Sequence, residues 1–409
     1  MRPTRALLAH ARTALAELLR FSRPADQALS SYFRRHRALG RQDRAFVAET
    51  AFAVLRRKRS LEAAAGSTAP RDLVIAALVR VFGLSGRALE EDAALVARVK
   101  SAPGRGLPDA VRADLPDWLW ERLAMEYGPR EAVAVAQGLL NPAPLDLRVN
   151  LAKHSRDKVL PLLDLEASPT PYSPAGIRLK GKPQINRHPL FLDGSVEVQD
   201  EGSQLLAYLL APRRGEMVAD FCAGAGGKTL AISMLMHGAG RVYAMDVSAK
   251  RLGELAPRAA RAGISNVHPI VLSGENDLRA KRLAGKLDRV LVDAPCSGFG
   301  TLRRNPDLKW RHDARAVSEL AAKQQRILDA SARLLKPGGR LVYATCSILR
   351  EENEQVVDRF VSLNREFAVV PCSEILRQQK IPLQAGEHLH LWPHRHGTDG
   401  FFAAAFERR

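Results

Sequence analysis

The stretch MVADFCAGAGGKTLAISMLM, residues 217–236, joins a short apolar run to a glycine-rich loop and then to a helical pattern. Small residues let the backbone of such a loop approach a ligand closely, and the N-terminus of the following helix faces the same point. A tight strand–helix turn without a ligand is the alternative explanation. The stretch predicts the first strand, loop and helix of an α/β domain, with a candidate ligand site at the loop.

Strand-like and helical segments alternate along the rest of the chain. The predicted strands are residues 217–221, 241–246, 267–272, 288–294 and 340–346, with a final strand in FFAAAFERR, residues 401–409. The longest helical segment is 315–336, and Gly338 and Gly339 are expected to end it. This alternation predicts a doubly wound, mostly parallel sheet.

The glycine loop lacks both common phosphate-binding patterns. A P-loop needs a glycine where this chain has Cys222, and the dinucleotide pattern G-x-G-x-x-G needs one where it has Thr229. Asp246 ends the second predicted strand, 20 residues beyond Gly226, and a carboxylate there can bind both ribose hydroxyls. The loop therefore suits a nucleoside cofactor without phosphates, such as S-adenosylmethionine.

Two cysteines each follow an apolar, strand-like run. Cys296 closes LDRVLVDAPC (287–296) and Cys346 closes GRLVYATC (339–346). Neighbouring parallel strands end at one edge of a sheet, the edge where open α/β sheets bind ligands. We therefore expect both thiols beside the glycine loop, where they could act covalently on an electrophilic carbon. Cys372 is expected to be a buried apolar residue, and the role of Cys222 is open.

The N-terminal part of the chain is helical and strongly basic. Residues 1–60 contain 14 Lys and Arg against 4 Asp and Glu, a net charge of +10. This is more than half of the net charge of +18 carried by all 409 residues. Helical periodicity covers 6–21, 43–64 and 72–84, and a Pro- and Gly-rich linker is predicted at 101–117. A field of this size favours a polyanionic partner over a merely solvated surface.

Composition argues against several classes of protein. No run of 18 apolar residues is present, so we expect no membrane span. The four cysteines show no CxxC spacing, which argues against zinc-ribbon and thioredoxin folds and favours free thiols in a reducing, cytoplasmic compartment. HLHLWPHRH (388–396) is rich in histidine but has no accompanying cysteine, and we expect no metal site there.

From about residue 118 to 409 the chain resembles the RNA (cytosine-5-)-methyltransferases of the RsmB/Sun (NOL/NOP/Sun) family. The matching motifs are DFCAGAGGKT, AMDVSAKRL, DAPCSGFGTLRRNPDLKW, YATCSILREEN, LRVN (147–150), VQDEGSQ (198–204) and the terminal DGFF (399–402). The N-terminal helices, with LGRQDRAFVAETAFAVLR, are similar to a NusB-like RNA-binding domain. One departure is that the family's usual loop, Ala-Ala-Pro-Gly-Gly-Lys, here lacks its proline.

The resemblance implies a fold with three parts. It implies an all-α NusB-like RNA-binding domain with a linker (1–117), a small α+β RNA-binding middle domain (118–205), and a Rossmann-like, class I S-adenosylmethionine-dependent methyltransferase domain (206–409). The expected activity is methylation of carbon 5 of a cytosine in RNA, with ribosomal RNA as the expected substrate, through a covalent cysteine–cytosine intermediate. We expect a monomer.

The resemblance also implies residue roles. It assigns attack on the base to Cys346 and product release to Cys296, which chain position alone cannot rank. Lys228 and Asp293 would contact the base or the cofactor, and Asp293 is placed to reach ring nitrogen 3 of the cytosine. The cofactor-binding set is Cys222, Ala223, Gly224, Ala225, Gly226, Gly227, Lys228, Asp246, Asp277 and Asp293.

Some assignments have competitors. Near the adenine, Glu275 and Asp277 both qualify, and Asp277 is preferred. Arg303, Arg304 and Lys309 follow Cys296 and could hold phosphates, although unliganded surface charges would look the same. One rival function is a non-catalytic RNA-binding assembly factor. Another is a DNA cytosine-5-methyltransferase, which would attack with Cys296 instead.

Overall fold

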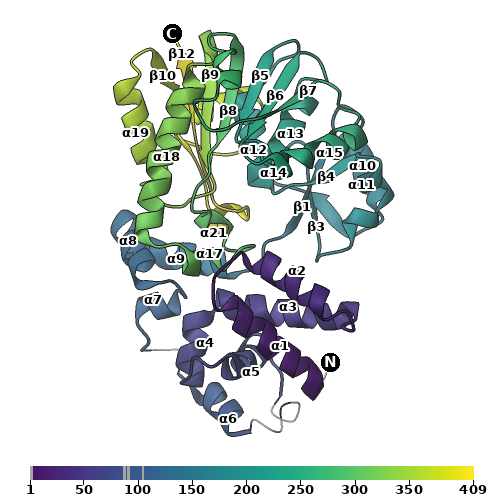
Figure 1. Ribbon diagram of the computed structural model, residues 1–409, viewed down its shortest axis with the longest axis vertical. Helices are drawn as coiled ribbons and strands as arrows, with labels where there is room; N and C mark the ends of the chain where they lie inside the picture. Colours follow the sequence, from purple (N-terminus) through teal and green to yellow (C-terminus); the bar gives the residue numbers. More distant parts are fainter. Residues whose placement is uncertain (1–2, 86–88, 90–92, 104–105) are drawn as a thin grey trace. The chain divides into compact units, whose positions relative to one another are not determined.

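The computed structural model describes residues 3–85, 89, 93–103 and 106–409 (Figure 1). Contacts divide the chain into two compact units, each described here by itself. Unit 1 comprises Met1–Pro142 and Thr301–Ala314, and unit 2 comprises Ala143–Gly300 and Arg315–Arg409. The division into three domains stays a prediction, and the predicted linker falls partly outside the described residues, at 104 and 105. No helix in the described ranges is long and apolar enough to cross a bilayer.

Unit 1 is built of helices, and buried apolar residues between Leu7 and Val99 form one core within it. The helices are α1 (Arg5–Leu18), α2 (Ala25–Arg35), α3 (Arg41–Arg56), α4 (Lys58–Ala65), α5 (Pro70–Arg80), α6 (Ala93–Ser101), α7 (Asp109–Arg112), α8 (Asp117–Tyr127), α9 (Pro129–Leu140) and α17 (Leu308–Arg311). The Thr4 hydroxyl accepts a hydrogen bond from the Leu7 N–H and starts α1. The predicted helix 43–64 is two helices, because Arg57 leaves helical geometry at φ −122° and ψ 34°.

The segment 301–314 of unit 1 corrects one sequence-based expectation. Lys309 is only 2% exposed, and its Nζ donates to the carbonyl oxygen of Arg56 at 2.8 Å. The indole of Trp310 donates to the carbonyl oxygen of Leu55 at 2.7 Å. These side chains satisfy carbonyls at the C-terminus of α3, which the helix itself leaves unpaired. Lys309 and Arg303 are therefore buried structural residues, not phosphate contacts.

Unit 2 contains two sheets. The small sheet is antiparallel, with strands in the order β2 (Ala167–Pro169), β3 (Gly176–Leu179), β1 (Leu145–Val149) and β4 (Val196–Val198). Its core includes Leu147, Ile177 and Val196. Short helices connect its strands: α10 (Arg156–Val159), α11 (Pro189–Leu192) and the 3-10 turns η2 (Leu160–Leu163) and η3 (Ile185–Arg187).

The large sheet has the strand order β10-β12-β9-β8-β5-β6-β7, and β11 pairs with β12. Its strands are β5 (Met217–Phe221), β6 (Arg241–Asp246), β7 (Val267–Val271), β8 (Leu287–Asp293), β9 (Leu335–Thr345), β10 (Phe367–Val370), β11 (Leu389–Leu391) and β12 (Phe401–Arg408). The five strands from β9 to β7 are parallel, whereas β12 runs antiparallel to β9. The predicted doubly wound, mostly parallel sheet is confirmed.

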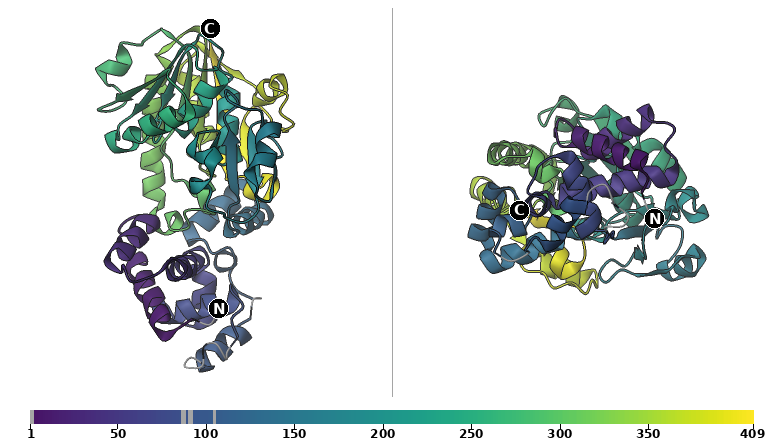
Figure 2. Two further views of the ribbon diagram at one scale, coloured as in Figure 1. Left: turned by 90° about the vertical axis from the view of Figure 1, so that its right-hand side faces the viewer. Right: turned by 90° about the horizontal axis from the view of Figure 1, so that it is seen from below.

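Helices cover both faces of the large sheet (Figures 1 and 2). They are α12 (Glu201–Leu210), α13 (Gly227–Leu235), α14 (Ala249–Gly253), α15 (Leu255–Ala262), α16 (Leu278–Lys281), α18 (Ala314–Ala332), α19 (Glu354–Leu363), α20 (Cys372–Gln378) and α21 (Pro393–His396), with the 3-10 turn η4 (Phe299–Thr301). Val218 and Leu291 pack with α12 and α13 on one face, while Ala219 and Val290 pack with α18 and α19 on the other. This double burial explains why the strands are almost continuously apolar.

The helix predicted at 315–336 ends earlier than expected, at Ala332. Leu335 already pairs with Leu287 of β8, so the chain enters the sheet before the two glycines. The register then shifts, and Gly338 takes a positive φ of 74° within this irregular part of β9. The glycines therefore shape a bulge and do not end the helix.

Candidate active site at the carboxyl edge of the large sheet

The two predicted thiols meet where β8 and β9 end. Cys346 follows β9 directly, and Cys296 lies three residues beyond β8. Because these strands are parallel neighbours, their carboxyl ends share one edge, and the two Sγ atoms lie 3.4 Å apart. Both side chains are half-buried. The pair can therefore exchange a proton and reach the same bound atom.

Both thiols line one cavity of about 420 Å³. This volume falls within the range of small-molecule sites in proteins. The wall is formed by Phe221, Cys222, Met245, Asp246, Val247, Arg251, Leu272, Gly274, Glu275, Asp293, Ala294, Pro295, Cys296, Lys323, Ile327 and Cys346. The structure thus brings Cys296 and Cys346 to the same cavity as Asp246, the acid at the end of β6.

The glycine loop between β5 and α13 needs its glycines for backbone shape. Gly224 and Gly226 have φ values of 57° and 83°, and an added Cβ would overlap Arg251 and Leu255, respectively. Cys222 also has a positive φ, of 87°, which is costly for a residue with a side chain. Among the described residues, the cavity wall includes Cys222, whereas the loop residues Ala223, Gly224, Ala225, Gly226, Gly227 and Lys228 are not part of it.

Asp246 fixes the loop to the end of β6. Its Oδ2 accepts the Gly224 N–H at 2.8 Å, and its Oδ1 accepts the Ser248 N–H at 2.7 Å. The carboxylate is 7% exposed and lies on the cavity wall. Each carboxylate oxygen has a second lone pair, so Asp246 can still accept hydrogen bonds from a ligand.

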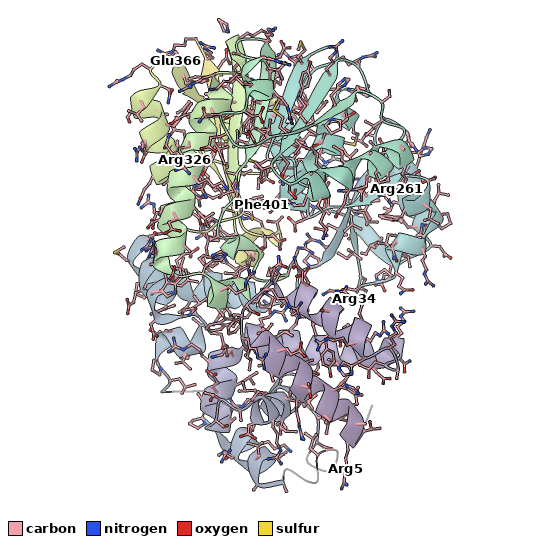
Figure 3. The ribbon with its side chains drawn as sticks, in the orientation of Figure 1. Arg5, Arg34, Arg261, Arg326, Glu366 and Phe401 are labelled. Carbon is pink, nitrogen blue, oxygen red and sulfur yellow. The ribbon has the colours of Figure 1, made fainter. Side chains whose placement is uncertain are left out.

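Lys228, in the first turn of α13, pairs with Asp293 at the end of β8. Their Nζ and Oδ2 atoms are 2.7 Å apart, and the ammonium also lies 5.8 Å from the centre of the Phe401 ring, at the start of β12 (Figure 3). Burial disfavours the charged amine, but the charge and hydrogen bond of Asp293 outweigh it and raise the pKa of Lys228. The site therefore contains a fixed positive charge.

The surroundings of Cys296 hold its thiol in the protonated form. The contact with the Cys346 sulfur, followed by burial and the charge of Glu352, raises the pKa of Cys296 well above its ordinary value. Burial also raises the pKa of Cys222, which argues against that residue as a nucleophile.

Asp277 and Glu275, the two acids considered for the adenine, lie in different surroundings. Asp277 caps α16, and its carboxylate accepts the N–H groups of Ser273 and Arg279, both at 2.7 Å. It is not on the cavity wall, whereas Glu275 is, and Arg326 (Figure 3) donates to Glu275 at 3.0 Å. The geometry therefore favours Glu275 over Asp277.

Sequence reasoning gave no role to Glu352, although this residue lies within the quoted motif YATCSILREEN. It is fully buried and accepts hydrogen bonds from the residues that follow both thiols. A buried acid cannot be distinguished from an exposed one by its chain position alone. Among the described residues, no group of three or more His, Cys, Asp or Glu side chains could hold a metal ion.

The fold and this site together define a Rossmann-like methyltransferase. The family model for 16S rRNA methyltransferase RsmB/F matches residues 207–407, and the RsmF/B-like ferredoxin-like domain model matches residues 115–186. The chain belongs to the RsmB/F family of methyltransferases. The helical N-terminal part is consistent with the predicted NusB-like domain.

Known proteins support the assignment. The chain is 37% identical over 300 residues to the Synechocystis protein named "Probable ribosomal RNA small subunit methyltransferase B", covering 72% of this chain and 66% of that protein. The chain thus spans about two thirds of the length of this curated relative. The crystal structure of PH0851 matches 99% of this chain and 98% of its own, with 26% identity and a TM-score of 0.77. The crystal structure of a methyltransferase homologue from Pyrococcus horikoshii matches 74% of this chain and 98% of its own, with 29% identity and a TM-score of 0.63.

Proposed function

We propose that this protein transfers a methyl group from S-adenosylmethionine to carbon 5 of a cytosine in RNA, with ribosomal RNA as the substrate. The observation that carries the proposal is the 3.4 Å pair of thiols on the wall of a cavity that also contains Asp246. The names of the ribosomal RNA methyltransferases to which the chain is similar support the choice of RNA.

The cavity suits a nucleoside-type methyl donor. Asp246 would bind the ribose hydroxyls, and Glu275 would approach the adenine edge in place of Asp277. Met245, Val247 and Leu272 supply apolar wall for a ring. When bound, the sulfonium supplies an electrophilic methyl group. The glycine loop contributes by fixing Asp246 through the Gly224 N–H.

The thiols supply what the cytosine lacks. Carbon 5 is a poor nucleophile, but addition of a thiolate to carbon 6 makes it enamine-like and able to accept the methyl group. Cys346 is the attacking thiol in this scheme, as the resemblance to the RsmB/Sun family implies, and the raised pKa of Cys296 keeps that second thiol protonated during the attack. The Lys228 ammonium would favour a thiolate in the site, and in this proposal Asp293, which lies on the cavity wall, shares a proton with ring nitrogen 3.

Product release uses the second thiol. The hydrogen bond with the Cys346 sulfur is the largest cause of the raised pKa of Cys296, and this bond weakens once Cys346 is bonded to carbon 6. Cys296 then ionises more easily, at the stage when the carbon 5 proton must be removed. The Cys296 thiolate takes that proton, the carbon 5–carbon 6 double bond re-forms, and Cys346 leaves carbon 6 as a thiolate.

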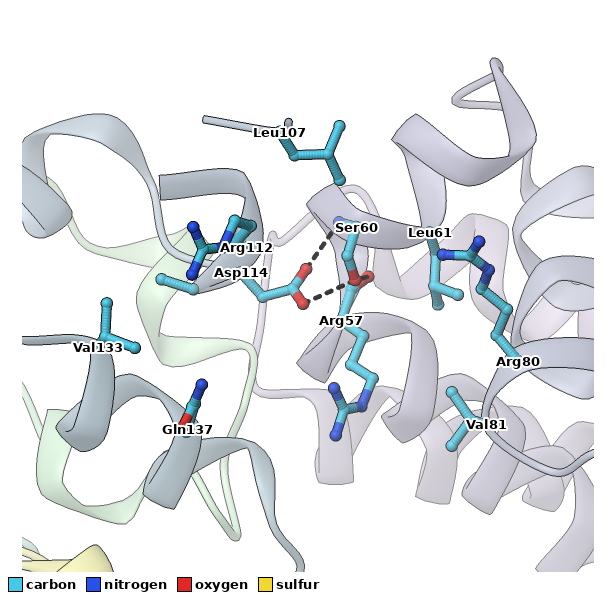
Figure 4. Close-up of a pocket in the computed structure, with 11 residues that line it drawn as sticks. Arg57, Ser60, Leu61, Arg80, Val81, Leu107, Arg112, Asp114, Val133 and Gln137 are labelled. Atoms are coloured by element: carbon cyan, nitrogen blue, oxygen red, sulfur yellow. Dashed lines mark hydrogen bonds between the residues drawn. The ribbon is translucent and has the colours of Figure 1, made fainter. Parts of the chain in front are cut away.

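An RNA partner is supported by the basic helices of unit 1. A cavity of about 510 Å³ there is lined by Arg57, Arg80 and Arg112 (Figure 4). Arg80 donates to backbone carbonyls, and the Asp114 carboxylate is occupied by the Ser60 N–H and hydroxyl at 2.8 and 2.7 Å. The Arg57 guanidinium makes no hydrogen bond to the described residues and is the strongest candidate for a phosphate contact. The target base must also be unstacked to reach the thiols.

The test compares Cys346→Ala and Cys296→Ala with ribosomal RNA and labelled S-adenosylmethionine. Cys346→Ala should abolish methylation, and Cys296→Ala should accumulate a protein–RNA adduct that survives a denaturing gel. Absence of an adduct from both variants would refute the two-thiol scheme. Loss of methylation in Cys296→Ala with activity retained in Cys346→Ala would indicate the attack used by DNA enzymes. Bisulfite mapping of cellular RNA with and without the protein distinguishes an enzyme from a non-catalytic assembly factor.

A further inference from the structure

A serine follows each thiol, and both serines are bound by one buried carboxylate. Glu352, which is 0% exposed, accepts the Ser297 hydroxyl at its Oε2 at 2.5 Å and the Ser297 N–H at its Oε1 at 2.8 Å. The Ser347 hydroxyl donates to the same Oε2 at 2.5 Å. The carboxylate therefore joins the turn after β8 to the turn after β9.

The carboxylate is itself fixed from other elements. Gln324 of α18 donates from Nε2 both to Glu352 Oε1 and to the Pro295 carbonyl oxygen, each at 3.0 Å. The Tyr343 hydroxyl donates to the backbone carbonyl oxygen of Glu352 at 2.6 Å. A buried carboxylate is costly unless it is hydrogen-bonded, and Ser297, Ser347 and Gln324 satisfy this one. The Tyr343 contact fixes the backbone of the same residue.

The thiols need such a connection because the strands stop before they reach them. The last pair in the β8–β9 register is Asp293 with Ala344, whereas Cys296 lies three residues further along. The Gly300 N–H, which donates to the Cys346 carbonyl oxygen at 2.8 Å, is a second, backbone link. The placement of one sulfur against the other thus depends on contacts between the two turns.

We propose that Glu352 is a positioning residue that holds the Cys296 and Cys346 turns together, so that their sulfurs stay within reach of one base. It touches neither the base nor the cofactor in this scheme, and it acts through Ser297 and Ser347. The proposal rests on the two-thiol function for its catalytic meaning. The geometric part can be tested without RNA or cofactor.

Two substitutions separate geometry from charge. In Glu352→Ala the Ser297 and Ser347 hydroxyls lose their common acceptor, and the two turns can drift apart. In Glu352→Gln the amide oxygen can still accept the Ser297 N–H, and the amide N–H₂ can donate to hydroxyls that rotate to accept. The conservative variant should therefore rescue most of what the alanine variant loses.

The first measurement is the rate of disulfide formation between Cys296 and Cys346 in the full chain, with Cys222 and Cys372 replaced by serine in every sample. Diamide oxidises the two thiols: the S–S bond forms, and two protons and two electrons pass to the reagent. We expect the wild type and Glu352→Gln to cross-link at similar rates and Glu352→Ala at least tenfold more slowly. Glu201→Ala is the matched control, because Glu201 is also a fully buried acid of unit 2 but binds the Tyr172 and Ser173 N–H groups.

The second measurement is single-turnover methylation of RNA. A misplacement of about 1 Å can cost about 10²-fold in rate, so we expect a loss of that order in Glu352→Ala and a much smaller one in Glu352→Gln. Equal cross-linking and equal methylation by the wild type and Glu352→Ala would overturn the proposal. Slow cross-linking of Glu352→Ala beside a wild type that cannot methylate RNA would instead refute the proposed function alone.

Should Glu352→Ala not fold, the double variant Ser297→Ala, Ser347→Ala decides the question. It removes both hydroxyl donors and leaves the Ser297 N–H and Gln324 contacts to the carboxylate. We expect slower cross-linking than in either single serine variant. A double variant that cross-links as fast as the wild type would contradict the proposal.

Discussion

At the scale of single residues, Asp220 of β5 is the buried group with the clearest pH consequence. Its Oδ2 accepts the Thr229 hydroxyl at 2.7 Å, its Oδ1 has no partner among the described residues, and the side chain is 0% exposed. Burial raises the pKa of Asp220 to about 6. Between about pH 4 and pH 6, Asp220 is therefore protonated in the native state and ionised in the unfolded chain.

This difference predicts that Asp220 destabilises the fold as pH rises through that window. Its contribution is most favourable below about pH 4 and is lost above about pH 6, with a change on the order of 3 kcal/mol. In urea unfolding at pH 4 and pH 8, Asp220→Asn should therefore gain free energy of unfolding relative to the wild type at the higher pH. Thr229→Val should enlarge the pH effect. Parallel pH profiles of wild type and Asp220→Asn would contradict the assignment.

At the scale of elements, the segment 301–314 is a structural part of the helical unit. Besides the contacts of Lys309 and Trp310 with the end of α3, Asp307 accepts the Ala25 N–H at the start of α2, at 3.2 Å. The segment thus satisfies backbone groups at the ends of two helices. Burial lowers the pKa of Lys309 to about 7, although Asp114 opposes the shift.

The lowered pKa predicts that docking of this segment strengthens at alkaline pH. The unfolded chain keeps the Lys309 proton up to about pH 10, so stability should rise between about pH 7 and pH 10 and stay low below pH 7. Lys309→Met should remove this rise. The difference in Tm between the wild type and the variant should therefore change by several degrees between about pH 7 and about pH 9.5. Lys58→Met, a variant of α4 in the same unit, controls for loss of a positive charge. A Lys309→Met profile that parallels the wild type would refute the prediction.

At the scale of the whole molecule, the charge of +18 predicts salt-sensitive binding to RNA. The log–log slope of affinity against salt should be about −0.7 per phosphate neutralised on a single strand. Arg57→Gln should reduce the magnitude of the slope by about 0.7, the value of one phosphate contact. The slope is measured by filter binding or fluorescence anisotropy between about 50 and about 200 mM salt. Arg315→Gln, which removes an exposed arginine paired with Glu319 on α18, is the matched control. A slope near zero for the wild type would remove the electrostatic basis for RNA as the partner.

The sequence by itself determined the parallel strands of the large sheet and the glycine loop between β5 and α13. The strands at 217–221 and 241–246 match β5 and β6, because apolar runs bounded by glycine and polar residues encode strands within short windows. The sequence also placed Cys296 and Cys346 after two strands, which suffices to put them at one edge once those strands are parallel neighbours.

Only the tertiary structure decided the partners of side chains far apart in the chain. Glu352 meets Ser297 across 55 positions, and Lys309 meets Arg56 across 253. The choice of Glu275 over Asp277 likewise depends on which acid faces the cavity and which caps a helix. Local patterns specify backbone shape and the buried face of each element. The burial and hydrogen bonding of a charged side chain depend on how elements pack, which no short window of sequence contains.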